Sequence, residues 1–99
     1  MAQDRQLEKG VETFFRDEVK RRGGLATKMI PVIAGLPDRL ALLPGGRFLL
    51  VELKRPRGGV YSAVQDAMHE RLRRMGFIVH RVKNRSEVLA LLNSEKEMR

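Results

Sequence analysis

Residues 35–54 read GLPDRLALLPGGRFLLVELK, and this stretch decides the fold. Two apolar segments flank the turn signal Pro44-Gly45-Gly46, which predicts a β-hairpin. Opposite residues of an antiparallel pair have numbers that add to a constant, and a three-residue turn at this site makes the sum about 90. The hairpin therefore places Asp38 opposite Glu52.

This register predicts a metal site. Directly opposed Cβ atoms lie roughly 5 Å apart, so both carboxylates can reach one Mg²⁺ at metal–oxygen distances of about 2.1 Å. Lys54 follows Glu52 by two residues and projects from the same sheet face. An acid pair and a lysine around a hard cation are typical of a phosphodiesterase. Asp38, Glu52 and Lys54 are the predicted catalytic residues.

The alternative interpretation is a solvated cluster of surface ions. Like charges opposed across two strands destabilise the pair unless a cation neutralises them. The run Phe48-Leu49-Leu50-Val51 also predicts a buried strand next to Glu52. Both observations favour the metal site.

Composition limits the chemistry further. The 99 residues suit one domain, and the net charge of +8 points to a polyanionic partner, with a merely basic soluble protein as the equally open alternative. The absence of cysteine excludes disulfides, thiolate zinc sites and thiol nucleophiles. A metal would need oxygen ligands, which favours Mg²⁺ or Mn²⁺. No signal region or membrane-spanning apolar run occurs, so we expect a cytoplasmic protein.

Periodicity outside the hairpin predicts three helices and two further strands. We expect helices at residues 4–22, 62–75 and 86–92, strands at 25–30 and 77–82, and a frayed tail at 93–99. The order αβββαβα predicts an α/β fold with a mixed central sheet flanked by helices, in a single domain spanning residues 1–99.

The first helix carries an acid in an unexpected place. Glu8 falls inside the apolar stripe, where an isolated carboxylate would be costly without a partner. A metal or its coordinated water would supply that partner. Glu12 at the edge of the stripe and Glu18 near the helix end are weaker candidates. The structural alternative is that Glu8 reaches solvent at the first turn.

The second helix opens with a capping box. Ser62 and Gln65 have the spacing in which each side chain bonds the other's backbone N–H, and this explains the pair without a catalytic role. His69 lies one turn later on the same face. It could meet substrate or be a structural histidine.

Basic residues follow the hairpin. Lys54, Arg55 and Arg57 surround the Gly58-Gly59 loop, whose bare backbone could approach phosphates closely. Further basic residues on the second helix include Arg73. Together they predict salt-dependent binding to phosphates, although each cluster alone could be a solvated face.

The ordered motifs resemble the virus-type replication-repair nuclease (VRR-NUC) domain of the PD-(D/E)xK nuclease superfamily. The resemblance spans about residues 7–92 and rests on a helix acid, Gly35-Leu-Pro-Asp38, Glu52-Leu-Lys54, Ser62-x-x-Gln65 and Met75-Gly-Phe77. It implies a single-domain fold of the restriction-endonuclease type. The restriction-type alternative, which reads a DNA sequence, is disfavoured because base readout usually needs added elements.

The resemblance also implies roles for individual residues. Asp38, Glu52 and the backbone carbonyl of Leu53 would hold Mg²⁺ or Mn²⁺, and Lys54 would position or activate water. Gln65 and the helix acid, Glu8 or alternatively Glu12, would complete the site. The residues expected to contact DNA are Arg55, Arg57, Gly58, Gly59, Ser62, His69 and Arg73.

Finally, the resemblance implies an activity. Free-standing phage and bacterial members are often dimeric and similar to Holliday-junction resolvases. We therefore expect a structure-selective DNA endonuclease that acts on branched or flapped DNA as a homodimer, without a membrane or a small-molecule cofactor. The competing interpretation is a non-catalytic basic DNA-binding module with the same fold.

Overall fold

The computed structural model describes residues 2–30, 32–54 and 61–97, with side chains described for residues 10–94 of these ranges. The element order is αβββαβα, as the sequence predicts. The elements are α1 (Ala2–Arg21), β1 (Leu25–Lys28), β2 (Arg39–Leu43), β3 (Arg47–Leu53), α2 (Ala63–Arg74), β4 (Val79–Val82) and α3 (Arg85–Glu97). No helix in the described ranges is long and apolar enough to cross a membrane.

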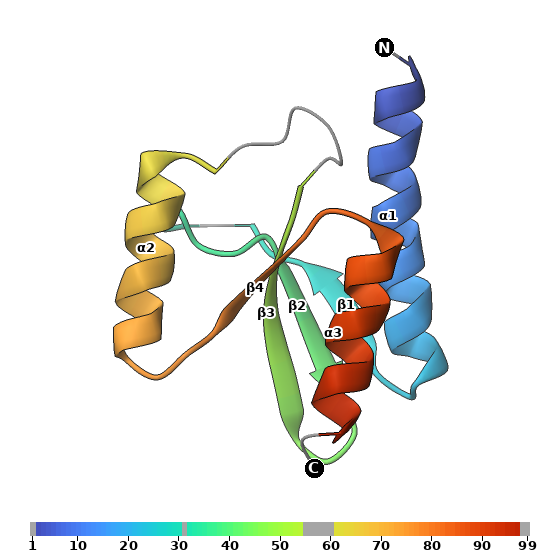
Figure 1. The fold of residues 1–99 in the computed structure, drawn as a ribbon. Coiled ribbons are helices and arrows are strands. Elements are labelled where there is room, and N and C mark those ends of the chain that lie inside the picture. The colour runs from blue at the N-terminus through green and yellow to red at the C-terminus, as the bar shows by residue number, and fades with distance from the viewer. Residues whose placement is uncertain (1, 31, 55–60, 98–99) are drawn as a thin grey trace.

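The four strands form one mixed sheet in the order β1-β2-β3-β4. The first three strands are antiparallel, and β4 runs parallel to β3. Helices α1 and α3 lie on one side of the sheet, and α2 lies on the other (Figure 1). This mixed α/β architecture is the predicted one.

The hairpin register is confirmed. Leu40 pairs with Leu50, so the residue numbers of opposite residues add to 90. The turn needs its glycines, because Gly45 and Gly46 have φ values of 89° and 75°, a region that other residues enter only with strain. Local turn chemistry therefore sets which residues of β2 and β3 face each other.

The hydrophobic core lies between the sheet and the helices α1 and α3. Odd-numbered residues of β2 and β3 point into it, while even-numbered residues point to the side of α2. The core residues are Val11, Phe15, Val19, Ala41, Leu43, Leu49, Val51, Val82, Val88 and Leu92.

Four predictions about these elements need correction. The first strand ends at Lys28, two residues earlier than predicted. The run 48–51 is buried only at Leu49 and Val51. Phe48 is 49% exposed, because it lies on the sheet face that α2 covers, but near the hairpin turn, where α2 does not reach. The last strand begins at Val79, two residues later than predicted. Helix α3 continues to Glu97 instead of ending in a frayed tail, and the Oδ1 of Asn93 accepts a hydrogen bond from Arg22 of the loop after α1.

Candidate active site

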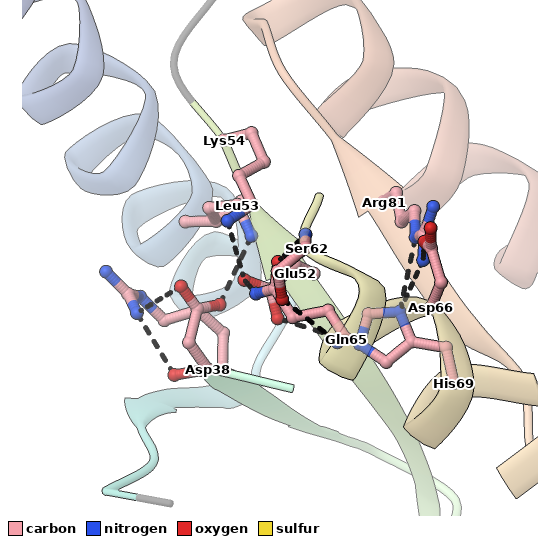
Figure 2. A network of polar contacts seen from close by, with 10 residues as sticks. Asp38, Glu52, Leu53, Lys54, Ser62, Gln65, Asp66, His69 and Arg81 are labelled. Atoms are coloured by element: carbon pink, nitrogen blue, oxygen red, sulfur yellow. Dashed lines mark hydrogen bonds and ion pairs between the residues drawn. The ribbon is translucent and has the colours of Figure 1, made fainter. Parts of the chain in front are cut away.

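Asp38 and Glu52 meet at the open end of the hairpin. Asp38 precedes β2, one residue before the first pair of the ladder, Arg39 with Val51. The backbone N–H of Leu53 donates to Asp38 Oδ1 at 3.2 Å, which ties the acid to β3. Figure 2 shows the two carboxylates and Lys54 around this strand end. The register thus delivers both predicted acids to one place.

Lys54 lies beside Glu52, as its spacing predicts. Its Nζ is 3.6 Å from Glu52 Oε2, and it also lies 5.3 Å from the centre of the Tyr61 ring. An amine in this position adds positive charge to a site that otherwise contains two negative groups.

Both carboxyl groups are perturbed by their surroundings. Glu52 is only 3% exposed, and burial raises its pKa, with a further increase from the charge of Asp38 that Lys54 opposes. Burial also raises the pKa of Asp38, against the attraction of Arg39. The protein without a bound cation therefore holds two acids that resist ionisation, which is typical of a functional site.

Gln65 takes part in both the helix cap and the site. Its backbone N–H donates to Ser62 Oγ at 3.1 Å, and its Oε1 accepts from the Ser62 N–H at 3.0 Å, so the predicted capping box is present. Its Nε2 donates to Glu52 Oε2 at 3.0 Å. The capping interpretation is correct but incomplete, because the amide nitrogen of Gln65 also binds Glu52.

The loop before Asp38 packs tightly against α2. Gly35 has a φ of 89°, and a Cβ at this position would lie 2.7 Å from the carbonyl oxygen of Val64 and 2.9 Å from Met68 Cβ. Only a glycine permits this approach. The same loop leads into Asp38, so the contact joins both parts of the site.

His69 is buried behind Glu52. It is 8% exposed, its Nδ1 accepts hydrogen bonds from Arg81, and its Nε2 is 3.9 Å from Glu52 Oε1. Burial lowers the pKa of His69 and the nearby Arg81 lowers it further, while Asp66 and the nearby backbone of Gly35 raise it. The sequence predicts a DNA contact for His69, but this environment leaves its ring little surface for one.

Sequence reasoning missed Arg81 and Arg39. Arg81 lies next to Glu52 in the parallel register of β3 and β4, which could have pointed to it. Arg39 is buried on the core side, with Nη2 3.0 Å from Glu12 Oε2 and Nη1 3.2 Å from Asp38 Oδ2. The signal for Arg39 was an arginine at a core-facing position directly after Asp38.

The helix acid stays a prediction. The carboxylate of Glu12 forms an ion pair with Arg39. Glu8 belongs to α1, but its side chain is not among those that the structure describes. Arg55, Arg57, Gly58 and Gly59 also fall outside the described residues. Arg73 is exposed on α2 and pairs with Glu70.

The site suits a hard cation. Carboxylate and carbonyl oxygens are the ligands that Mg²⁺ and Mn²⁺ prefer, and Asp38, Glu52 and the Leu53 carbonyl offer such a set. Glu52 Oε1 is buried and accepts no hydrogen bond from the described residues, so it has a lone pair to offer. No group of three or more His, Cys, Asp or Glu side chains able to hold a metal occurs in the described part of the chain.

Two known proteins are similar to this chain, one compared by sequence and one by structure. No protein-family model matches the chain. A solved structure described as "VRR_NUC domain" superposes with a TM-score of 0.79 at 30% identity, covering 87% of this chain and 94% of that one. The protein "Putative nuclease p44" of Acyrthosiphon pisum secondary endosymbiont phage 1 is 36% identical over 89 residues, which are 87% of this chain and 95% of that protein. The chain belongs to the VRR-NUC family of nuclease domains.

Proposed function

We propose that this nuclease is a Mg²⁺- or Mn²⁺-dependent DNA endonuclease that hydrolyses phosphodiester bonds during replication, repair or recombination in the cytoplasm. One observation carries the proposal. The buried Glu52 carboxylate and the half-buried Asp38 carboxylate meet a lysine at the open end of the hairpin, and Glu52 Oε1 accepts no hydrogen bond from the described residues there. The net charge of +8 supports a nucleic-acid substrate.

The residues divide the chemistry between them. Asp38, Glu52 and the Leu53 carbonyl would hold the cation, which when bound supplies Lewis-acid polarisation of the phosphate and a more acidic water. Lys54 orients the attacking water and adds positive charge where negative charge grows in the transition state. Gln65 holds the Glu52 carboxylate through Oε2.

The direct test is cleavage of labelled linear, flap, splayed and four-way DNA with Mg²⁺ or Mn²⁺. Asp38→Asn and Glu52→Gln keep the size of each side chain and remove its charge, so cleavage should disappear while DNA binding persists. Asp17→Asn is the matched control, because Asp17 is an exposed acid on α1. If the wild-type protein cuts none of these substrates with either metal, the non-catalytic DNA-binding module replaces the enzyme.

We further propose that the substrate is branched or flapped DNA and that the protein acts as a homodimer, since two matched nicks need two sites related by symmetry. The sheet offers an apolar row for such a contact. Leu25, Leu42 and Phe48 are neighbours in the register and are 61%, 43% and 49% exposed. Exposed apolar surface of this kind marks interaction sites.

The homodimer is tested by measuring molar mass in solution. Phe48→Asp should convert a wild-type dimer into a monomer, because it places a charge within the apolar row. Val32→Asp changes an exposed apolar side chain on the loop before Gly35 and should leave the mass unchanged. A monomeric wild type, or a Phe48→Asp dimer, contradicts this interface.

A further inference from the structure

Two buried polar atoms that have no hydrogen-bond partner among the described residues face each other. Glu52 Oε1 and His69 Nε2 are each buried and without a hydrogen bond from the described residues. The distance between them is 3.9 Å, too long for a hydrogen bond. A buried group left unpaired is costly, so a pair of such atoms calls for a physical explanation.

The other nitrogen of the imidazole determines what His69 can offer. Arg81 Nε and Nη2 lie 3.2 Å and 3.0 Å from His69 Nδ1. A guanidinium only donates, so Nδ1 must accept and carries no proton. In the neutral ring the proton then lies on Nε2, the atom that faces Glu52.

Arg81 is itself held in place. Its Nη2 lies 2.7 Å from Asp66 Oδ1, and its guanidinium stacks 3.9 Å from the centre of the Tyr61 ring. The ion pair with Asp66 of α2 (Figure 2) and the ring of Tyr61, the residue before the helix cap, therefore hold the donor that selects the tautomer. The order of groups is Arg81, His69 and then Glu52.

We propose that His69 and Arg81 are positioning residues for Glu52: Arg81 keeps the proton of His69 on Nε2, and this N–H orients the Glu52 carboxylate through Oε1. Gln65 already donates to Oε2, so the two donors together set the plane of the carboxylate, and Oε1 keeps its second lone pair for the cation. A movement of about 1 Å closes the 3.9 Å gap to a normal hydrogen bond. The inference rests on the proposed function, because it assigns these residues to the metal-binding acid of that site.

The tautomer can be measured on the metal-free protein. Long-range ¹H–¹⁵N correlation spectra of histidine-labelled protein at pH 8 should show His69 with a protonated Nε2 and an unprotonated Nδ1. In Arg81→Met the spectrum should shift to a mixture of tautomers. A proton on Nδ1 in the wild type, or an unchanged tautomer in Arg81→Met, overturns the proposal.

The effect on Glu52 is measured as Mn²⁺ affinity by calorimetry, with folding checked by thermal unfolding. His69→Leu should weaken Mn²⁺ binding by about 10-fold, the usual scale for a partner of a metal ligand. His69→Gln restores a donor and should bind Mn²⁺ nearly as tightly as the wild type, as should the control His80→Gln, which changes the other histidine. A folded His69→Leu with wild-type affinity overturns the proposal.

The two proposals fail in different ways. If the wild type binds no Mn²⁺, the proposed metal-dependent nuclease fails, and with it the part of the inference that concerns metal binding, whatever the tautomer. If the wild type binds Mn²⁺ and cleaves DNA but His69 carries its proton on Nδ1, only the positioning role fails.

Discussion

Gly35 approaches α2 so closely that a Cβ built on it would lie 2.7 Å from the carbonyl oxygen of Val64. The loop that contains Gly35 leads to Asp38, and the helix that contains Val64 supplies Gln65 and His69. One contact therefore joins two parts of the site that are far apart in sequence. The contact depends on the absence of a single methyl group.

Gly35→Ala should destabilise the fold and separate the two parts of the site. The change adds the cost of a positive φ to a clash with Val64 and Met68, so we expect a loss of more than about 2 kcal/mol in the free energy of unfolding. Urea unfolding measures it. Gly46→Ala is the control, because Gly46 also has a positive φ but nothing lies within 4 Å of the added Cβ. Equal losses in both variants would show that the contact with α2 is unimportant.

The stability of the metal-free protein should depend on the state of Glu52. Burial and the charge of Asp38 raise its pKa in the folded protein. In the unfolded chain the pKa of a glutamate is about 4.3. The folded protein therefore binds the Glu52 proton more tightly than the unfolded chain does. The stability that this proton contributes is fully present below the unfolded pKa and is lost as the pH rises through the folded pKa. Above the folded pKa, each unit of difference between the folded and unfolded pKa values of Glu52 lowers the free energy of unfolding by about 1.4 kcal/mol.

Glu52→Gln removes this titration, so in EDTA the variant should be more stable than the wild type at pH 8. The advantage should shrink as the pH falls toward 4. Denaturant unfolding at several pH values measures the difference in the free energy of unfolding between the variant and the wild type. The effects of the other titrating groups cancel in this difference. A variant that is less stable than the wild type at pH 8 would contradict the unfavourable burial of the Glu52 carboxylate and its repulsion by Asp38.

Substitutions at Gln65 and Ser62 should separate capping from catalysis. Gln65→Glu keeps a carbonyl-type acceptor for the Ser62 N–H but replaces the donor to Glu52 with a like charge. We expect the helix cap to persist while cleavage falls at least about 10-fold. Ser62→Ala should cost about 1 kcal/mol of stability and leave cleavage of the folded protein nearly intact. Cleavage rates and thermal unfolding of both variants test this, and equal loss of activity would contradict the separation.

Arg39 should be important for stability because it is buried between two acids. Arg39→Met leaves Asp38 and Glu12 without their partner, and we expect a loss of about 2–4 kcal/mol, limited because Glu12 is 37% exposed. Chemical unfolding measures this loss. The control Arg21→Met removes an exposed ion pair with Glu18 and should change stability little. If Arg39→Met is as stable as the wild type, the ion pairs of Arg39 do not hold the first helix to the site.

Sequence reasoning succeeded where interactions are local. The αβββαβα order, the hairpin register and the capping box each follow from neighbouring residues and are confirmed by the structure. It failed where burial depends on distant elements. Phe48 has the character of a core residue but is 49% exposed, because α2 leaves the hairpin end of its sheet face uncovered.

The sequence by itself brought Asp38, Glu52 and Lys54 together, because a three-residue turn sets the register of the hairpin and the alternation of a strand puts Glu52 and Lys54 on one face. Only the tertiary structure decided what surrounds them. The docking of α2 on Gly35 brings Gln65 and His69 to Glu52, and the approach of α1 gives Arg39 its partner Glu12. Such contacts depend on how separate elements pack in space, and no local spacing encodes that packing.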